Sequence, residues 1–196
     1  MIRIGLLDTT VPETPSSMAR YRDQLLSAYA KHAGERLQAD VIYLGCNDQA
    51  MSKVPRRFRT WYRHLHIYQT AKRTNLDRFD VVHLLDGSFG YVVDAVRHPR
   101  VLVTVHDIIP RLQMDDYFDG APTVGRPARW LIRRALRGVG NASLVCADSQ
   151  STANDLQRYG CTPNLGIRVI PLAVEPDLFD DAGASATKPM VPCETV

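Results

Sequence analysis

Short apolar runs alternate with longer amphipathic segments along most of the chain. Runs of four to six residues, typical of strands buried on both faces of a parallel sheet, occur at 2–7, 41–44, 81–85, 101–105, 143–147 and 167–171. Apolar positions spaced by three or four residues predict helices at 16–32, 54–73 and 126–137, and a further helix, capped by Ser149 or Ser151, is predicted to run to about Tyr159. The stretch from His106 to Thr123 shows neither pattern, and we expect a long loop there. The alternation predicts an α/β, Rossmann-like three-layer domain with a mainly parallel sheet of about six or seven strands, Val101–Val105 central among them.

The apolar pattern ends near Phe179. Residues 1–180 are therefore predicted to form one domain, which is a usual size for a single hydrophobic core. Residues 181–196 lack any apolar period and are expected to be a linker or tail.

Composition and charge exclude several classes of protein. The net charge of +3 is too small to favour nucleic-acid binding. No stretch approaches the roughly 18–20 apolar residues that cross a bilayer. The four cysteines, Cys46, Cys146, Cys161 and Cys193, are far apart and form no C-x-x-C pair, which argues against a disulfide framework or a zinc site. We expect a cytoplasmic protein with reduced thiols, no metal and no bound cofactor.

The most informative loop follows the strand at 101–105. In a parallel sheet, ligands bind outside the carboxyl ends of the strands, where His106 and Asp107 stand. An imidazole there can donate a hydrogen bond from one nitrogen while a carboxylate or carbonyl holds the other. Asp107 could be that carboxylate, or it could cap the following turn. The alternative is that His106 is a half-buried structural histidine, and position alone does not separate the two.

Two later segments extend this observation. Residues 147–156 read as a strand ending at Asp148-Ser149 with a helix opening after it, and residues 167–179 contain Val-Ile-Pro-Leu-Ala-Val-Glu and end in Phe179. Together with His106-Asp107, in this order and spacing, they resemble the N-terminal domain of the family-4, GT-B-fold glycosyltransferases. The resemblance spans essentially residues 1–180.

The resemblance implies a role for several residues. His106 would lie in the interdomain cleft beside the transferred sugar, Asp107 would help to orient it, and Ser149 would cap a helix facing the cleft. The loops after the first and third strands would lie near donor diphosphate and acceptor, which makes cleft-binding candidates of Ser16, Ser17, Arg20, Tyr21, Gly87 and Ser88.

Some positions depart from the family pattern. Ser16-Ser17 stands where the family usually has two glycines, and serines restrict the backbone where glycines let its amides approach a phosphate. Ala173 and Glu175 replace the usual Gly and Asp. The paired glutamates and basic pair by which the family's C-terminal domain holds the nucleotide-sugar are not found after Phe179.

The function implied is transfer of a sugar, with retention, from a nucleotide-sugar to a glycan, lipid or small-molecule acceptor. The donor would be held by a C-terminal domain that this chain does not include. We therefore expect a truncation, a fragment or one subunit of a split enzyme that is inactive alone.

Two basic amphipathic segments, Arg56–His66 and Arg126–Arg137, suggest contact with anionic lipid at the inner face of a membrane. The alternative is that both are solvated faces of surface helices.

Other functions of this fold fit less well. No glycine occurs in Asp8–Ser17, so the G-x-G-x-x-G of a dinucleotide-dependent oxidoreductase is missing. A response-regulator receiver needs an acidic pair at the first strand end, whereas Asp8 and Asp86 are isolated. A non-catalytic acceptor-binding or assembly subunit stays open as the alternative.

Overall fold

The computed structural model describes residues 1–12 and 15–172. Within them one six-stranded sheet forms in the order β2-β1-β3-β4-β5-β6, and every neighbouring pair is parallel. The strands are β1 (Ile2–Asp8), β2 (Leu37–Tyr43), β3 (Val81–Leu84), β4 (Val101–Val105), β5 (Leu144–Ala147) and β6 (Ile167–Val169). The predicted α/β, Rossmann-like fold is confirmed, and β4 lies inside the sheet between β3 and β5.

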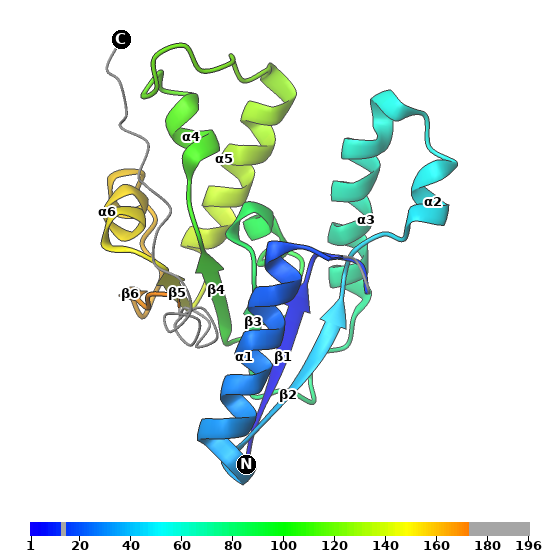
Figure 1. The fold of residues 1–196 in the computed structure, drawn as a ribbon, viewed down its shortest axis with the longest axis vertical. Helices are drawn as coiled ribbons and strands as arrows, with labels where there is room; N and C mark the ends of the chain where they lie inside the picture. The colour runs from blue at the N-terminus through cyan, green and yellow to red at the C-terminus, as the bar shows by residue number, and fades with distance from the viewer. Residues whose placement is uncertain (13–14, 173–196) are drawn as a thin grey trace, which may run out of the picture.

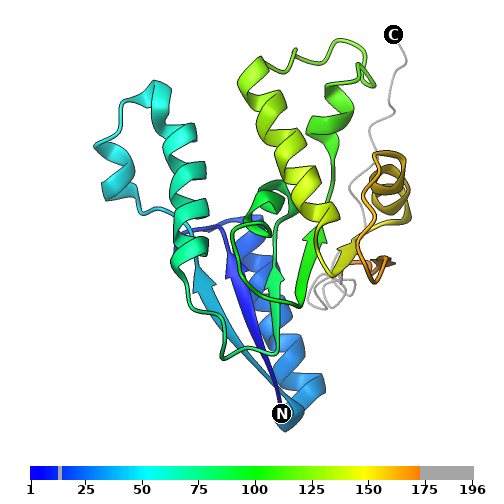
Figure 2. The same ribbon diagram turned by 180° about the vertical axis from the view of Figure 1, so that it is seen from behind.

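Helices cover both faces of the sheet. The α-helices are α1 (Ser17–Ala33), α2 (Asp48–Ser52), α3 (Arg59–Arg73), α4 (Ile109–Gln113), α5 (Arg126–Gly140) and α6 (Gln150–Arg158), and the 3₁₀ helices are η1 (Gly34–Arg36), η2 (Arg56–Phe58) and η3 (Gly87–Val92). In Figure 1, α1 lies across one face, and the reverse view in Figure 2 shows α3 and α5 on the other.

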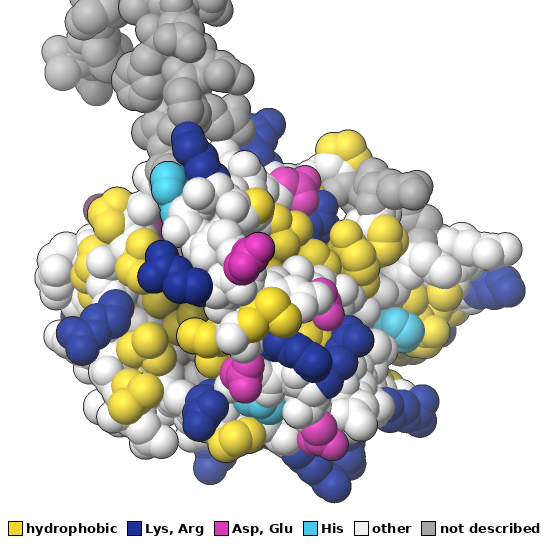
Figure 3. All heavy atoms as spheres, turned by 90° about the horizontal axis from the view of Figure 1, so that it is seen from below, with side chains coloured by type: hydrophobic (Ala, Val, Ile, Leu, Met, Phe, Trp, Pro, Cys, Tyr) yellow, Lys and Arg dark blue, Asp and Glu magenta, His cyan; other side chains and the backbone are white. Residues whose placement is uncertain are grey.

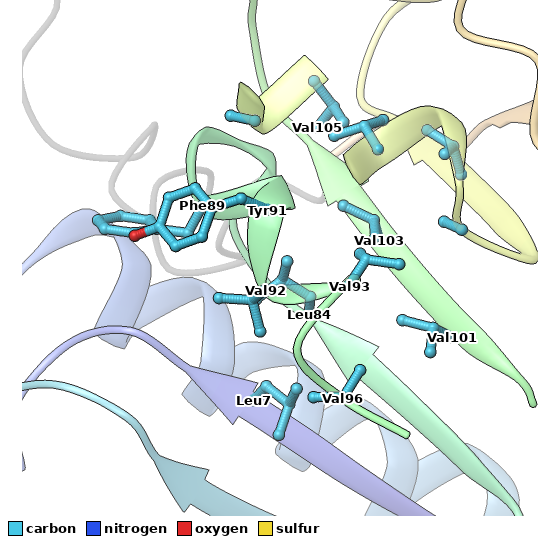
Figure 4. Close-up of a cluster of buried hydrophobic side chains, with 14 of the residues drawn as sticks. Leu7, Leu84, Phe89, Tyr91, Val92, Val93, Val96, Val101, Val103 and Val105 are labelled. Atoms are coloured by element: carbon cyan, nitrogen blue, oxygen red, sulfur yellow. The ribbon is translucent and has the colours of Figure 1, made fainter. Parts of the chain in front are cut away.

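The strands sort their side chains by alternation. Ile4, Leu6 and Leu85 pack under the apolar side of α1. On the opposite face a larger core fills the space below η3, α3, α5 and α6. Figure 4 shows this core with Leu84 and Val103 projecting from neighbouring strands toward η3.

The contact between η3 and α5 depends on two glycines. A methyl group at Gly138 would overlap the carbonyl of Gly90, and one at Gly90 would overlap the carbonyl of Ala135. The backbones therefore approach more closely than any side chain would permit. This contact fixes α5 against the turn that follows β3.

Three of the differences from the predicted boundaries have a clear physical reason. The predicted loop after β4 contains α4, which is too short to show a helical period and has Pro110 in its first turn. The predicted helix 54–73 begins as η2 after Pro55, and α3 starts at Arg59. The second strand begins at Leu37 rather than at the predicted residue 41. Its start was missed because β2 is a half-exposed edge strand, and polar residues interrupt its apolar pattern.

Candidate active site

The loops that follow β1, β3, β4 and β5 meet at the carboxyl edge of the sheet. The chain crosses from β2, on one side of β1, to β3 on the other, so the strand order reverses at this edge beside β1. Ligands of open α/β sheets bind at such a reversal. Of the candidate residues of the sequence analysis, His106, Asp107, Tyr21, Gly87, Ser88 and Ser149 contact one another's loops at this edge, whereas Ser16, Ser17 and Arg20 lie at the start of α1, as the following contacts show.

His106 leaves β4 into this edge and is half-buried. Its Nε2 lies 3.2 Å from the carbonyl oxygen of Leu85, just after β3. Because a carbonyl oxygen only accepts, Nε2 is the donor. The Nδ1 atom lies 3.7 Å from Asp148 Oδ2, which is beyond hydrogen-bond length but close enough for an ion pair if the ring is protonated. The backbone of β3 and the carboxylate after β5 thus flank the ring.

Asp107 is exposed, and its Oδ1 accepts a hydrogen bond of 2.9 Å from the amide of Ile109. Of the two roles that the sequence left open for Asp107, this geometry is that of a cap on the turn into α4. The carboxylate that faces His106 belongs to Asp148. Sequence reasoning assigned Asp148 no role, although it directly precedes Ser149 at the end of β5.

Ser149 is the N-cap of α6: its Oγ accepts a 3.1 Å hydrogen bond from the amide of Thr152. The buried Thr152 hydroxyl in turn lies 3.2 Å from the carbonyl oxygen of His106 and 3.3 Å from Asp148 Oδ1. The predicted cap is confirmed. Through Thr152 the same cap fixes the backbone of His106 and the carboxylate of Asp148.

Tyr21 covers His106 from the side of α1. The two rings meet edge to face with centroids 4.9 Å apart. The Tyr21 hydroxyl is 3.1 Å from Thr104 Oγ1, which is also 2.8 Å from Nε2 of the buried His83. Burial raises the pKa of Tyr21 and lowers that of His83 to about 4, with His106 contributing to the second shift. Both side chains are therefore neutral near pH 7.

Ser16, Ser17 and Arg20 lie on the first turns of α1 and are exposed. Ser16 is the N-cap, with its Oγ accepting a 3.0 Å hydrogen bond from the amide of Ala19. Ser17 stands one turn before Tyr21 on the same side of the helix. The three residues line an open hollow along the first turns of α1, apart from the contacts that surround His106.

Gly87 and Ser88 follow β3 and border a cavity of about 70 Å³ together with Asp107. A methyl group at Gly87 would stand 2.6 Å from Val105 Cγ2, so the turn packs against the end of β4. The amide of Ser88 donates a hydrogen bond of 2.8 Å to Asp86 Oδ1, and the Ser88 side chain is exposed. The structure thus brings these two residues beside the His106-Asp107 loop.

An ion pair at the end of β1 was not foreseen. Asp8 is 1% exposed, and its Oδ2 lies 2.8 Å from Arg22 NH1. Its Oδ1 accepts a hydrogen bond of 2.7 Å from the amide of Thr10. The carboxylate is thus satisfied from both sides, so it anchors α1 to β1. A carboxylate at a strand end and an arginine in the second turn of the following helix were the available signal.

The two basic segments lie on either side of a groove. It is a cavity of about 460 Å³ between α3 and α5. The rings of Trp61 and Trp130 face each other across it, with their centroids 6.0 Å apart. The surface seen from below in Figure 3 instead mixes basic, acidic and hydrophobic side chains.

Of the helices described, none is long and apolar enough to cross a membrane. In residues 1–12 and 15–172 no three His, Cys, Asp or Glu side chains are placed to hold a metal ion.

Comparison with known families decides the assignment. Residues 15–178 match the sequence profile described as Glycosyltransferase Family 4. The chain belongs to glycosyltransferase family 4. The resemblance to the N-terminal domain of these GT-B enzymes is confirmed. Ala173, Glu175 and the boundary at 180 lie outside the described residues.

One matching solved structure is titled "Crystal structure of LpCGTa in complex with UDP". It shares 11% sequence identity with this chain, with a TM-score of 0.48. The match covers 92% of this chain and 56% of that one, so the chain spans about half the length of this structural relative. A search of curated proteins finds no match.

Proposed function

We propose that this chain is the acceptor-side, N-terminal half of a family-4 enzyme that transfers a sugar, with retention, from a nucleotide-sugar to an acceptor. The observation that carries the proposal is the placement of His106 in a chain of this family. Its half-buried ring stands at the carboxyl end of the central strand β4, one strand away from the pair β1 and β3 where the strand order reverses, with Leu85, Asp148 and Tyr21 around it. In this proposal the donor is held by a second domain that packs over this edge.

His106 acts through Nδ1. With Nε2 donating to Leu85, the neutral ring offers Nδ1 as an acceptor for a hydroxyl of the sugar in transfer. The carboxylate of Asp148 lies 3.7 Å from the same nitrogen and stabilises the partial positive charge that the ring gains as it accepts this hydrogen bond. A contact of this kind, preorganised toward the reacting group, lowers the barrier without moving any part of the site. Arg20 and Ser17, exposed on the first turns of α1, border the space left for donor and acceptor.

The experiment is a nucleotide-release assay over a panel of nucleotide-sugars and acceptors. It compares the 196-residue chain with a protein in which a donor-binding domain follows it. We expect release above the no-enzyme control only in the second case. Turnover by the 196-residue chain alone, abolished by His106→Ala, would place the donor site in this chain. No release by either protein, combined with saturable acceptor binding, would favour the non-catalytic acceptor-binding subunit.

A further inference from the structure

The groove between α3 and α5 combines exposed apolar rings with positive charge that is only partly paired. Trp61 and Leu65 line it from α3, and Trp130 and Leu131 line it from α5. Leu65 and Trp130 remain more than half exposed, at 55% and 57%. Large apolar side chains gathered in one concave surface are typical of a binding site rather than of scattered surface residues.

The charges at the groove have one sign. Arg134 and Arg137 follow Trp130 by four and seven residues, so they lie on the same face of α5 and border the groove. Arg134 is paired with Asp94 at 3.0 Å, whereas the side chain of Arg137 has no ion pair or hydrogen bond within the described part of the chain. No Asp or Glu occurs anywhere in residues 49–76 or 120–147, which include α3 and α5. An anionic group in the groove would therefore meet the unpaired guanidinium of Arg137 on α5 and no carboxylate from either helix.

The same lining argues against a neutral sugar as the occupant. The residues that line the groove include no Asp, Glu, Asn or Gln, so no carboxylate or side-chain amide is there to pair with several sugar hydroxyls. Two of the polar groups that line the groove are already joined, since His64 Nδ1 and the Tyr91 hydroxyl lie 2.7 Å apart. What remains for a ligand is mainly apolar surface, the guanidinium groups and the hydroxyl of Tyr68.

We infer that this groove binds one amphiphilic anion, with an alkyl or isoprenoid chain against Trp61, Leu65 and Trp130 and a phosphate on Arg137. Resting on the proposed function, this makes the acceptor a lipid phosphate rather than a free sugar. The occupant is a single molecule, because the surface is a groove between two helices rather than a flat apolar face. A volume of about 460 Å³ is within the range of small-molecule sites.

The chain carries its own probe for this site, because both of its tryptophans, Trp61 and Trp130, line the groove. The test is a titration of tryptophan emission with decyl phosphate below its micelle concentration, compared with decyl glucoside and inorganic phosphate. We expect a saturable blue shift with decyl phosphate, and affinity about tenfold weaker for the glucoside, since one charge-assisted contact is lost. Inorganic phosphate should cause no shift. Arg137→Gln should remove the preference for the phosphate.

Leu65→Asp places a negative charge in the groove at an exposed position and should weaken decyl phosphate binding by about tenfold. Leu165→Asp is the matched control, because Leu165 is similarly exposed in the loop before β6 and should bind like the parent. Thermal melts of both variants verify that they fold.

Equal affinity for the phosphate and the glucoside would overturn the inference, as would the absence of saturable binding or indifference to Leu65→Asp. A shift with vesicles of phosphatidylglycerol but not with monomeric decyl phosphate would also overturn it, because the helices would then contact a bilayer. None of these readouts requires a donor or turnover. Failure of the groove and failure of the glycosyltransferase assignment are therefore distinguishable.

Discussion

Asp148 Oδ2 lies 3.7 Å from Nδ1 of His106, although 42 residues separate the two along the chain. The parallel pairing of β4 with β5 makes this possible, because Val105 pairs with Ala147 and the next residues leave the sheet together. On the other side of the ring, Nε2 is engaged by Leu85. The chemistry of His106 is therefore set by one carboxylate and one carbonyl from the neighbouring strand ends.

The first prediction separates the two aspartates near His106. Asp148→Asn removes the charge beside Nδ1 but keeps an oxygen for Thr152. We expect sugar-transfer turnover of the complete enzyme to fall on the order of tenfold or more. Asp107→Asn keeps the acceptor for the Ile109 amide and should leave turnover near that of the parent. The opposite pattern would make Asp107 the orienting residue.

The second prediction concerns the anchor of α1. Arg22→Met leaves the carboxylate of Asp8 buried without its counter-ion, so the free energy of unfolding should fall by about 3–5 kcal/mol. Arg36→Met, at an exposed position just after α1, is the control and should change it by less than about 0.5 kcal/mol. Urea unfolding measures both. If Arg22→Met unfolds like the parent, the pair contributes nothing to holding α1.

The third prediction is a pH dependence of stability. Burial lowers the pKa of His83 to about 4 in the folded chain, against about 6.5 unfolded. Between these values the unfolded chain binds more protons, so stability falls on acidification from pH 6.5 to pH 4 and is independent of this group above pH 6.5. The loss should be about 3 kcal/mol, since each pKa unit is worth about 1.4 kcal/mol.

His83→Gln, which keeps a polar group near Thr104, should flatten this part of the unfolding curve relative to the parent. Identical pH profiles for parent and variant would show that His83 does not titrate as its burial requires.

Sequence patterning was sufficient for the sheet because its strands carry nearly continuous apolar runs. Val101–Val105 and Ile2–Leu7 could be placed from apolar content alone. The helix α4 could not, because five residues span little more than one turn and show no period. The edge strand β2 was found only in part, since Gln38 and Asp40 interrupt its apolar pattern.

The site was predictable where a residue stands at a strand end and not where contact depends on neighbours distant in sequence. His106 and Ser149 were identified from their place after β4 and β5. The partnership of His106 with Asp148 requires knowing which strands pair. The contact of Tyr21 with Thr104 requires the crossing of α1 over the sheet. A histidine within an otherwise apolar strand, as His83 is, was the one signal for the buried network that went unused.

The fourth prediction tests the contact between η3 and α5. Gly138→Ala would place a methyl group on the carbonyl of Gly90, and we expect a loss of about 1–3 kcal/mol in the free energy of unfolding. Gly140→Ala is the control on the same helix, because its added methyl group would stand 3.8 Å from the nearest atom. It should be neutral or stabilising by up to about 1 kcal/mol. If Gly138→Ala stabilised the fold as Gly140→Ala does, helix propensity would dominate and the close contact with Gly90 would not explain the glycine.

The central claim, that His106 acts on the transferred sugar, is tested most directly by His106→Ala in the complete two-domain enzyme. Turnover should fall on the order of a hundredfold, because a preorganised contact to the reacting group is lost. The melting curve should stay close to that of the parent, as it should for His32→Ala at an exposed position of α1. An enzyme that melts much earlier than the parent while its folded fraction keeps full turnover would contradict the account, and His106 would then be a structural residue.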